Sequence, residues 1–189
     1  MFEQTFGDYV CEGDGITCKE KGFTVTASVH RDDDMGPPWK EHDGHGSVSD
    51  WRPKDSKRPG EKILTEDRGS CRFYDWQEAI KTAKADGWDA PPYGEGTPGQ
   101  RAERSVQRDF ETLQEWCNND WWWGYVTLTV YRNGIEVLDY AASLCGIAVN
   151  CGDDNNRLLE VANELLSEAI EKAEARVSSM VLALATPED

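Results

Sequence analysis

Residues 121–142 read WWWGYVTLTVYRNGIEVLDYAA, two runs that favour β-structure with Asn133-Gly134 between them. An Asn-Gly pair in this position is the strongest short-range signal for a β-hairpin closed by a two-residue type I′ turn. Neighbouring strands joined by so short a loop must be antiparallel. We therefore expect the fold to be built around an antiparallel hairpin.

The turn also predicts a register, because side chains alternate between the two faces of each strand. It pairs Arg132 with Ile135, Val130 with Val137 and Val126 with Ala141. Asp139 then falls on the apolar face of the hairpin, where a carboxylate is out of place. We therefore expect a β-bulge or the end of a strand near Asp139.

Helical signals lie on both sides of the hairpin. Asp75-x-x-Glu78 resembles a capping box, and Gly87 is a suitable stop, so we expect a helix over about 75–86. Apolar residues recur at helical spacing over about 98–118 and about 154–182. The sequence predicts an α+β fold, in which an antiparallel sheet with a central hairpin at about 121–142 packs against these three helices.

The length of 189 residues suits a single α+β domain. Residues 1–22 are acidic and contain glycine, so we expect an irregular arm there, with room for a short strand. Phe23 to Val29 alternates apolar and polar residues, as a half-buried strand does. Residues 31–60 are rich in proline and glycine and predict a long loop, and the tryptophans at 39 and 51 indicate that this loop packs onto something.

The charge of the chain limits its partners. Acidic residues outnumber basic ones by 36 to 20, for a formal net charge of −16. Nucleic-acid binding needs clustered Lys and Arg, so we expect no direct nucleic-acid contact. No apolar run approaches the roughly 20 residues of a membrane span, and the N-terminus lacks the features of a signal peptide. The sequence therefore predicts a cytoplasmic protein without a membrane partner.

The histidines form the first candidate site. His30, His42 and His45 lie within 16 residues of one another, and Asp43 stands among them. Imidazole and carboxylate together suit a divalent transition metal. The spacing matches no hydrolase motif, so whether the chain is an enzyme stays open, with a non-enzyme favoured. The alternative is a polar loop without cofactor, whose histidines cap turns and bond to carboxylates.

The last predicted helix carries the second candidate site. Glu160, Glu164 and Glu168 are four residues apart, which places them on one side of a helix, with about 6 Å between one glutamate and the next. Glu171 extends the charge around the helix. A row of this kind resembles the phosphates along a nucleic-acid strand and would suit a basic groove. The alternative is an ordinary solvated helix face.

Trp121, Trp122 and Trp123 form the third candidate site. Exposed tryptophans are frequent hot spots in protein interfaces, so Trp121 and Trp122 are candidate partner-binding residues. The alternative is a run that straddles the sheet, with two rings in the core and one at the rim.

Three segments resemble a group of uncharacterised acidic accessory proteins of tailed phages and prophages. They are Trp39–Gly46, Arg72–Trp76 and Ser143–Ile147, and the resemblance extends over roughly 23–174. Those proteins combine a Trp-rich strand, a Ser-Leu-x-Gly-Ile segment and an acidic final helix. Cys145 departs from the pattern, because an aromatic residue is expected there. The resemblance implies a small protein acting in the cytoplasm of an infected bacterial host cell, and no family activity carries over.

Charge and resemblance together lead to a functional hypothesis. We expect an inhibitor of a host defence complex, of the anti-CRISPR or anti-restriction type, which binds protein and acts as a DNA mimic. Its partner would be a host protein with a basic nucleic-acid-binding groove. The alternative is a metal-binding protein or metal-dependent enzyme that uses the His- and Asp-rich loop 30–45. A structural or regulatory protein without mimicry is the third reading.

Overall fold

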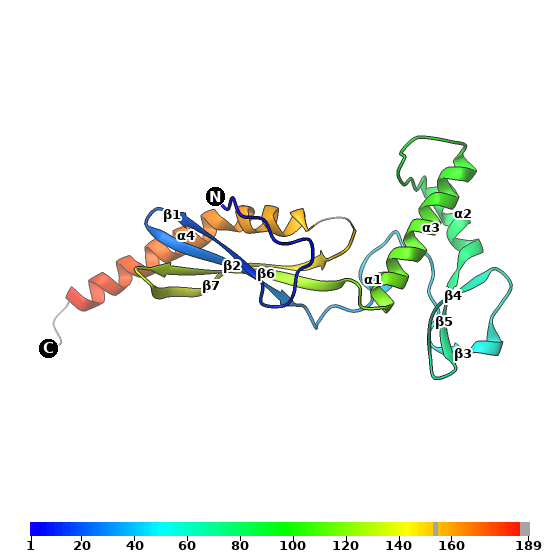
Figure 1. The fold of residues 1–189 in the computed structure, drawn as a ribbon, viewed down its shortest axis with the longest axis horizontal. Helices are drawn as coiled ribbons and strands as arrows, with labels where there is room; N and C mark the ends of the chain where they lie inside the picture. Colours follow the sequence, from blue (N-terminus) through cyan, green and yellow to red (C-terminus); the bar gives the residue numbers. More distant parts are fainter. Residues whose placement is uncertain (153–154, 186–189) are drawn as a thin grey trace. The chain divides into compact units, whose positions relative to one another are not determined.

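A computed structural model describes residues 1–152 and 155–185 of the chain (Figure 1). The fold is α+β, with antiparallel sheets and helices. The chain divides into two compact units, which we call unit 1 (residues 1–34 and 121–189) and unit 2 (residues 35–120). None of the helices within the described residues is long and apolar enough to cross a membrane.

Unit 1 contains a four-stranded antiparallel sheet in the order β1-β2-β6-β7. Its strands are β1 (Gly15–Glu20), β2 (Phe23–Arg31), β6 (Trp122–Arg132) and β7 (Ile135–Val149). Asn133 and Gly134 form the loop between β6 and β7, with φ values of 52° and 78°. Positive φ at both positions is what a type I′ turn requires, and Arg132 pairs with Ile135. The predicted hairpin is confirmed.

The predicted register fails beyond the turn. Val130 pairs with Leu138 instead of Val137, and Val126 pairs with Leu144 instead of Ala141. The register shifts three times along this strand pair, so β7 contains extra residues. The irregularity expected near Asp139 is confirmed. A regular ladder would bury this carboxylate on the apolar face, whereas the bulged strand leaves it exposed.

Helix α4 (Asn156–Ala185) covers one face of this sheet, as Figure 1 shows. The core between them consists of fully buried side chains from β2, β6 and α4, among them Val25, Val29, Val126, Leu128, Leu158, Val161, Ala162 and Ile170. The other face of the sheet carries the alternate residues of the same strands, such as Thr26, His30 and Tyr125. The helix predicted at about 154–182 is confirmed, although residue 154 lies outside the described residues.

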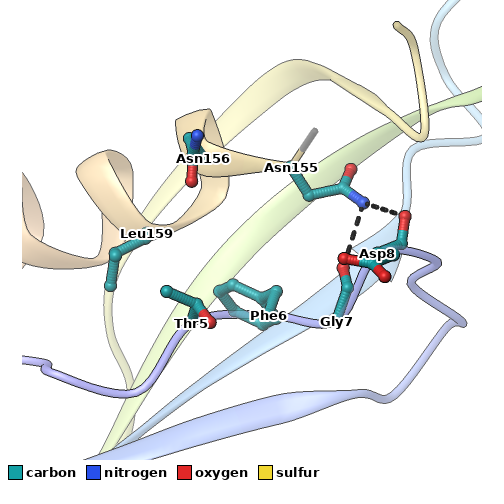
Figure 2. Close-up of a pocket in the computed structure, with 7 residues that line it drawn as sticks. All are labelled: Thr5, Phe6, Gly7, Asp8, Asn155, Asn156 and Leu159. Carbon is teal, nitrogen blue, oxygen red and sulfur yellow. Dashed lines mark hydrogen bonds between the residues drawn. The ribbon is translucent and has the colours of Figure 1, made fainter. Parts of the chain in front are cut away.

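The N-terminal arm of unit 1 is attached to the beginning of α4. The Asn155 side-chain amide donates to the carbonyl oxygens of Gly7 and Asp8, at 3.4 and 3.2 Å (Figure 2). Its Oδ1 accepts a hydrogen bond of 2.8 Å from the backbone N–H of Asn150. One buried amide thus holds the arm, the end of β7 and the start of α4 together. The second half of the arm forms β1.

Unit 2 has a separate sheet in the order β3-β5-β4. Its elements are α1 (Pro38–Glu41), β3 (Arg52–Pro53), the 3₁₀ helix η1 (Lys54–Ser56), β4 (Glu61–Asp67), β5 (Ser70–Asp75), α2 (Trp76–Asp86) and α3 (Pro98–Cys117). Both α2 and α3 pack against β4 and against each other. The two predicted helices are confirmed, but they pack on this second sheet rather than on the hairpin. Helical periodicity identifies an apolar stripe and does not identify the sheet that covers it.

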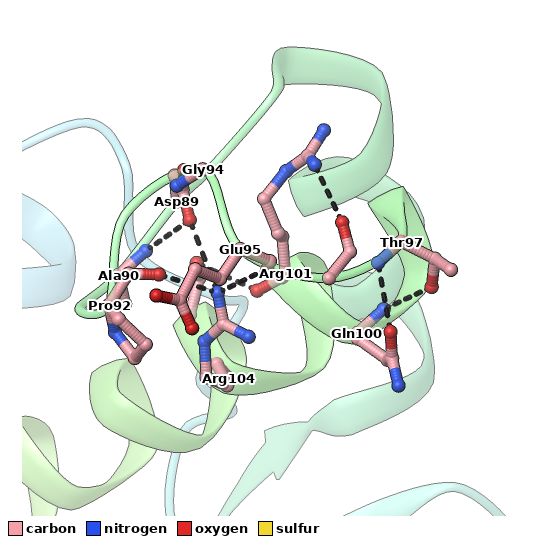
Figure 3. A network of polar contacts seen from close by, with 11 residues as sticks. Asp89, Ala90, Pro92, Gly94, Glu95, Thr97, Gln100, Arg101 and Arg104 are labelled. Atoms are coloured by element: carbon pink, nitrogen blue, oxygen red, sulfur yellow. Dashed lines mark hydrogen bonds and ion pairs between the residues drawn. The ribbon is translucent and has the colours of Figure 1, made fainter.

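Side-chain caps explain where α2 and α3 begin. Asp75 Oδ1 accepts from the N–H of Glu78, and Thr97 forms a reciprocal capping box with Gln100. Figure 3 shows the loop that precedes α3, in which Arg104 donates to the carbonyl oxygens of Pro92 and Glu95. These bonds order a loop that is rich in proline and glycine.

Candidate functional site

The solvent-facing side of α4 presents the predicted carboxylate row. Glu160, Glu164 and Glu168 are exposed, with 63%, 56% and 56% of their side-chain surface accessible. Glu171 is exposed as well. The buried residues of α4 lie on its opposite side, toward the sheet. The four glutamates named from the sequence therefore share a surface, one helical turn apart.

Two cations partly neutralise this row. Arg157 Nη1 lies 3.1 Å from Glu160 and 2.8 Å from Glu164, and these carboxylates, Glu164 most strongly, raise the pKa of Arg157 above its ordinary value. Lys172 Nζ lies 2.6 Å from Glu168 and also donates to the carbonyl oxygen of Ala141, at 2.9 Å. Exposed ion pairs of this kind are weak. The sequence prediction overlooked them, although the spacings of Arg157–Glu160 and Glu168–Lys172, three and four residues, are typical of such pairs on a helix.

The acidic excess of the chain is concentrated in unit 1. Unit 1 holds 19 acidic and 7 basic residues, whereas unit 2 holds 17 and 13. The formal net charges are thus −12 and −4. A surface of one sign attracts partners of the other sign over several ångströms. The unit that contains α4 is therefore the one suited to a basic partner.

The tryptophan run does not form an exposed rim. Trp121, Trp122 and Trp123 are 3%, 6% and 8% exposed. Consecutive side chains on a strand point to opposite faces, so burial of both Trp122 and Trp123 in β6 means that both faces of the strand are covered here. The Trp121 ring packs edge-on against Trp123, and the Arg31 guanidinium lies 5.1 Å from the Trp122 ring centre. These tryptophans are core residues in this structure and offer little surface to a partner.

The predicted metal ligands belong to different units. His30 is on β2 in unit 1, whereas His42, Asp43 and His45 follow α1 in unit 2. Within residues 1–152 and 155–185, no group of three or more His, Cys, Asp and Glu side chains could hold a metal ion. The metal hypothesis gains no support from this arrangement and stays a prediction for elemental analysis.

His45 instead contacts Asp109, a residue that the sequence did not single out. His45 Nδ1 lies 2.6 Å from Asp109 Oδ1, and Asp109 Oδ2 accepts from the Gly46 N–H at 2.8 Å and from the Tyr74 hydroxyl at 2.7 Å. Burial, together with the Asp109 charge, raises the pKa of Tyr74, which keeps this phenol protonated as a donor. The carboxylate joins the loop at 45–46, β5 and α3. It lies 64 residues from His45, so no local pattern could reveal the contact.

A carboxylate that orients an imidazole also occurs in general-base catalysis. In a catalytic triad, the other ring nitrogen is bonded to a nucleophilic hydroxyl or thiol of the protein. Among the described contacts, the partner of the His45 ring is Asp109 alone. The described contacts of Asp109 connect the loop at 45–46 with β5 and α3.

Comparisons with protein-family models, with curated proteins and with solved structures found no match to this chain.

Proposed function

We propose that this protein is a phage-encoded inhibitor that binds a host protein through the acidic side of α4. The partner is a defence protein with a basic groove for nucleic acid, of the kind used by CRISPR or restriction complexes. The observation that carries the proposal is the exposed row Glu160, Glu164, Glu168 and Glu171 in a unit of net charge −12.

The row has the regularity of a nucleic-acid strand. Carboxylates about 6 Å apart repeat a single negative charge along a straight element. A groove lined with Lys and Arg to bind phosphates would meet them with complementary charge. Arg157 and Lys172 reduce the net charge of the row, and the Arg157 side chain can turn toward solvent when a stronger cationic surface arrives, because its exposed pairs are weak.

The phage context of the proposal comes from the resemblance of Trp39–Gly46, Arg72–Trp76 and Ser143–Ile147 to accessory proteins of tailed phages. A protein of that kind acts in the cytoplasm of the infected bacterium. Its binding is to protein, without direct contact to nucleic acid or membrane.

The test is capture followed by competition. The immobilised protein is exposed to bacterial lysate, bound proteins are identified by mass spectrometry, and their binding is measured against salt concentration. We expect a nucleic-acid-binding protein whose affinity falls steeply as salt rises, because charges are screened within about 8 Å at physiological ionic strength. Excess duplex DNA or guide RNA should displace it.

The matched variants differ only in where they remove charge. Glu160→Gln, Glu164→Gln and Glu168→Gln together should slow association by about tenfold or more. Glu66→Gln, Asp67→Asn and Glu103→Gln remove the same charge from exposed positions of unit 2 and should leave association nearly unchanged. A partner that binds together with nucleic acid, or equally well to both triple variants, would exclude mimicry by α4.

A further inference from the structure

Three rings form a stack on the face of the unit 1 sheet that α4 does not cover. His30 on β2 pairs with Tyr125 on β6, and their ring centres lie 5.2 Å apart with planes inclined by 25°. The ring of Tyr140, on β7, lies 6.4 Å from His30 at an inclination of 27°. We call Tyr125, His30 and Tyr140 the ring stack. Its members alternate along β2 and β6 with the core residues Val29 and Val126.

Tyr140 is held in an unfavourable conformation that displays its ring. Its φ is +49°, which is uncommon for a bulky residue, and 57% of its surface is exposed. Asp139 Oδ1 stabilises this backbone by accepting hydrogen bonds from the Tyr140 N–H and from Thr129 Oγ1, at 3.0 and 2.9 Å. Strained backbone that is supported in this way is often found at binding sites.

An exposed carboxylate lies beside the ring stack. The Asp139 carboxylate is exposed beside Tyr140. Burial raises the pKa of the Tyr125 phenol, with further contributions from its neighbour Tyr140 and from the charge of Glu12. Carboxylates near aromatic faces favour a cation, and they repel the phosphates that would accompany a stacked nucleic-acid base.

We propose that the ring stack is an anchor site for an arginine side chain of a protein partner. A planar guanidinium can lie over the Tyr140 ring and donate to the Asp139 carboxylate at the same time, which a Lys ammonium does less well. The anchor rests on the proposed function only in that both require a basic partner. It lies on the opposite face of the sheet from α4, so the two surfaces can be tested independently.

The direct test uses a defined probe, the peptide acetyl-Gly-Arg-Gly-amide, titrated into the full-length protein and followed by NMR. We expect saturable shifts of the His30, Tyr125 and Tyr140 ring signals and upfield shifts of the arginine side-chain protons. The same peptide with citrulline in place of arginine keeps the shape and loses the charge, and it should produce little shift. Equal shifts from the two peptides would overturn the proposal.

Variants locate the site. Tyr140→Ala should weaken arginine-peptide binding by about two- to fivefold, the range of an exposed cation–π contact, while Tyr140→Phe should keep it. Tyr93→Ala, at an exposed tyrosine of unit 2, is the matched control and should have no effect. Amide spectra of each variant establish that the sheet is intact. Binding that survives Tyr140→Ala in a folded protein would contradict the anchor.

The α4 triple variant separates the two proposals. With Glu160, Glu164 and Glu168 changed to Gln, the arginine peptide should still shift the ring stack. Loss of the shifts in this variant would mean that the peptide responds to overall charge, and the anchor would fail. Persistent shifts together with unchanged capture of a partner would instead refute α4 mimicry alone.

Discussion

Glu61 shows how a single buried carboxylate is kept ionised in unit 2. Its side chain is 7% exposed, and it accepts hydrogen bonds of 2.7 Å from Arg52 Nη2 and from the backbone N–H of Arg58. Burial acts to raise the pKa of Glu61, but the hydrogen bonds and charges of the two arginines outweigh it, so that the pKa is lowered. The folded protein therefore favours the carboxylate form.

This shift predicts a pH-dependent effect of Glu61→Gln. A lowered folded-state pKa gives stability that is present above the unfolded pKa of about 4.3 and is lost as pH falls through the folded value. At pH 7 the variant should lose about 1–3 kcal/mol of unfolding free energy. The difference should shrink below about pH 4 in urea titrations. Glu66→Gln, which removes an exposed ion pair with Lys54, is the control and should have little effect at any pH.

At the scale of elements, the β6–β7 turn depends on backbone conformation alone. Gly134 has a φ of 78°, and an added Cβ would meet no atom within 4 Å. Gly134→Val should therefore destabilise the protein through backbone strain, by about 1–3 kcal/mol. Gly134→Asn should cost clearly less, because Asn tolerates this region. Thermal unfolding measures both, and equal melting temperatures for the Val and Asn variants would show that strain at this turn is unimportant.

The elements that the sequence predicted are those with local causes. Asn133-Gly134 dictates its turn, and the caps at Asp75 and Thr97 mark helix starts within a few residues. The pairing of β6 with β7 around and beyond Asp139 depends instead on where the β-bulges of β7 fall, and the packing of the whole sheet determines those positions. In α4, Leu165 is only partly buried, whereas Val161 and Ile170 are fully buried. The curvature and position of the sheet that α4 covers determine which apolar residues of the helix are fully buried.

The same distinction applies to the candidate sites. The glutamate row was visible in the sequence because residues four apart on a helix must share a side. The ring stack joins β2, β6 and β7 over about a hundred residues, and Asp109 meets His45 across 64. Contacts between residues so far apart in the sequence form only when the chain folds. The sequence therefore did not reveal which of these residues lie next to one another.

At the scale of the whole molecule, the two units have separate core clusters. The unit 2 cluster contains Leu64, Tyr74, Val106 and Leu113 and draws on unit 2 residues, whereas the unit 1 cluster joins β2, β6, β7 and α4. The sequence predicted a single domain, and only an unfolding experiment can test whether both units unfold together.

Leu113→Ala provides that experiment. Leu113 is fully buried, so its truncation should destabilise unit 2 by about 2–5 kcal/mol. We expect faster hydrogen exchange in α2, α3 and β4, with the protection of β2 and β6 unchanged. Faster exchange throughout both units would show that the chain unfolds as the one domain that its length predicts.

The contact between Lys172 and β7 has a consequence for the behaviour of the protein at high concentration. β7 is one of the two edge strands of its sheet, and edge strands with unpaired backbone groups can recruit other chains into aggregates. Lys172 occupies the carbonyl oxygen of Ala141, and the bulges of β7 interrupt the regular ladder that an incoming strand would need. Lys172 thus links α4 to the β7 edge, and together with the bulges it should disfavour the pairing of a second copy with this strand.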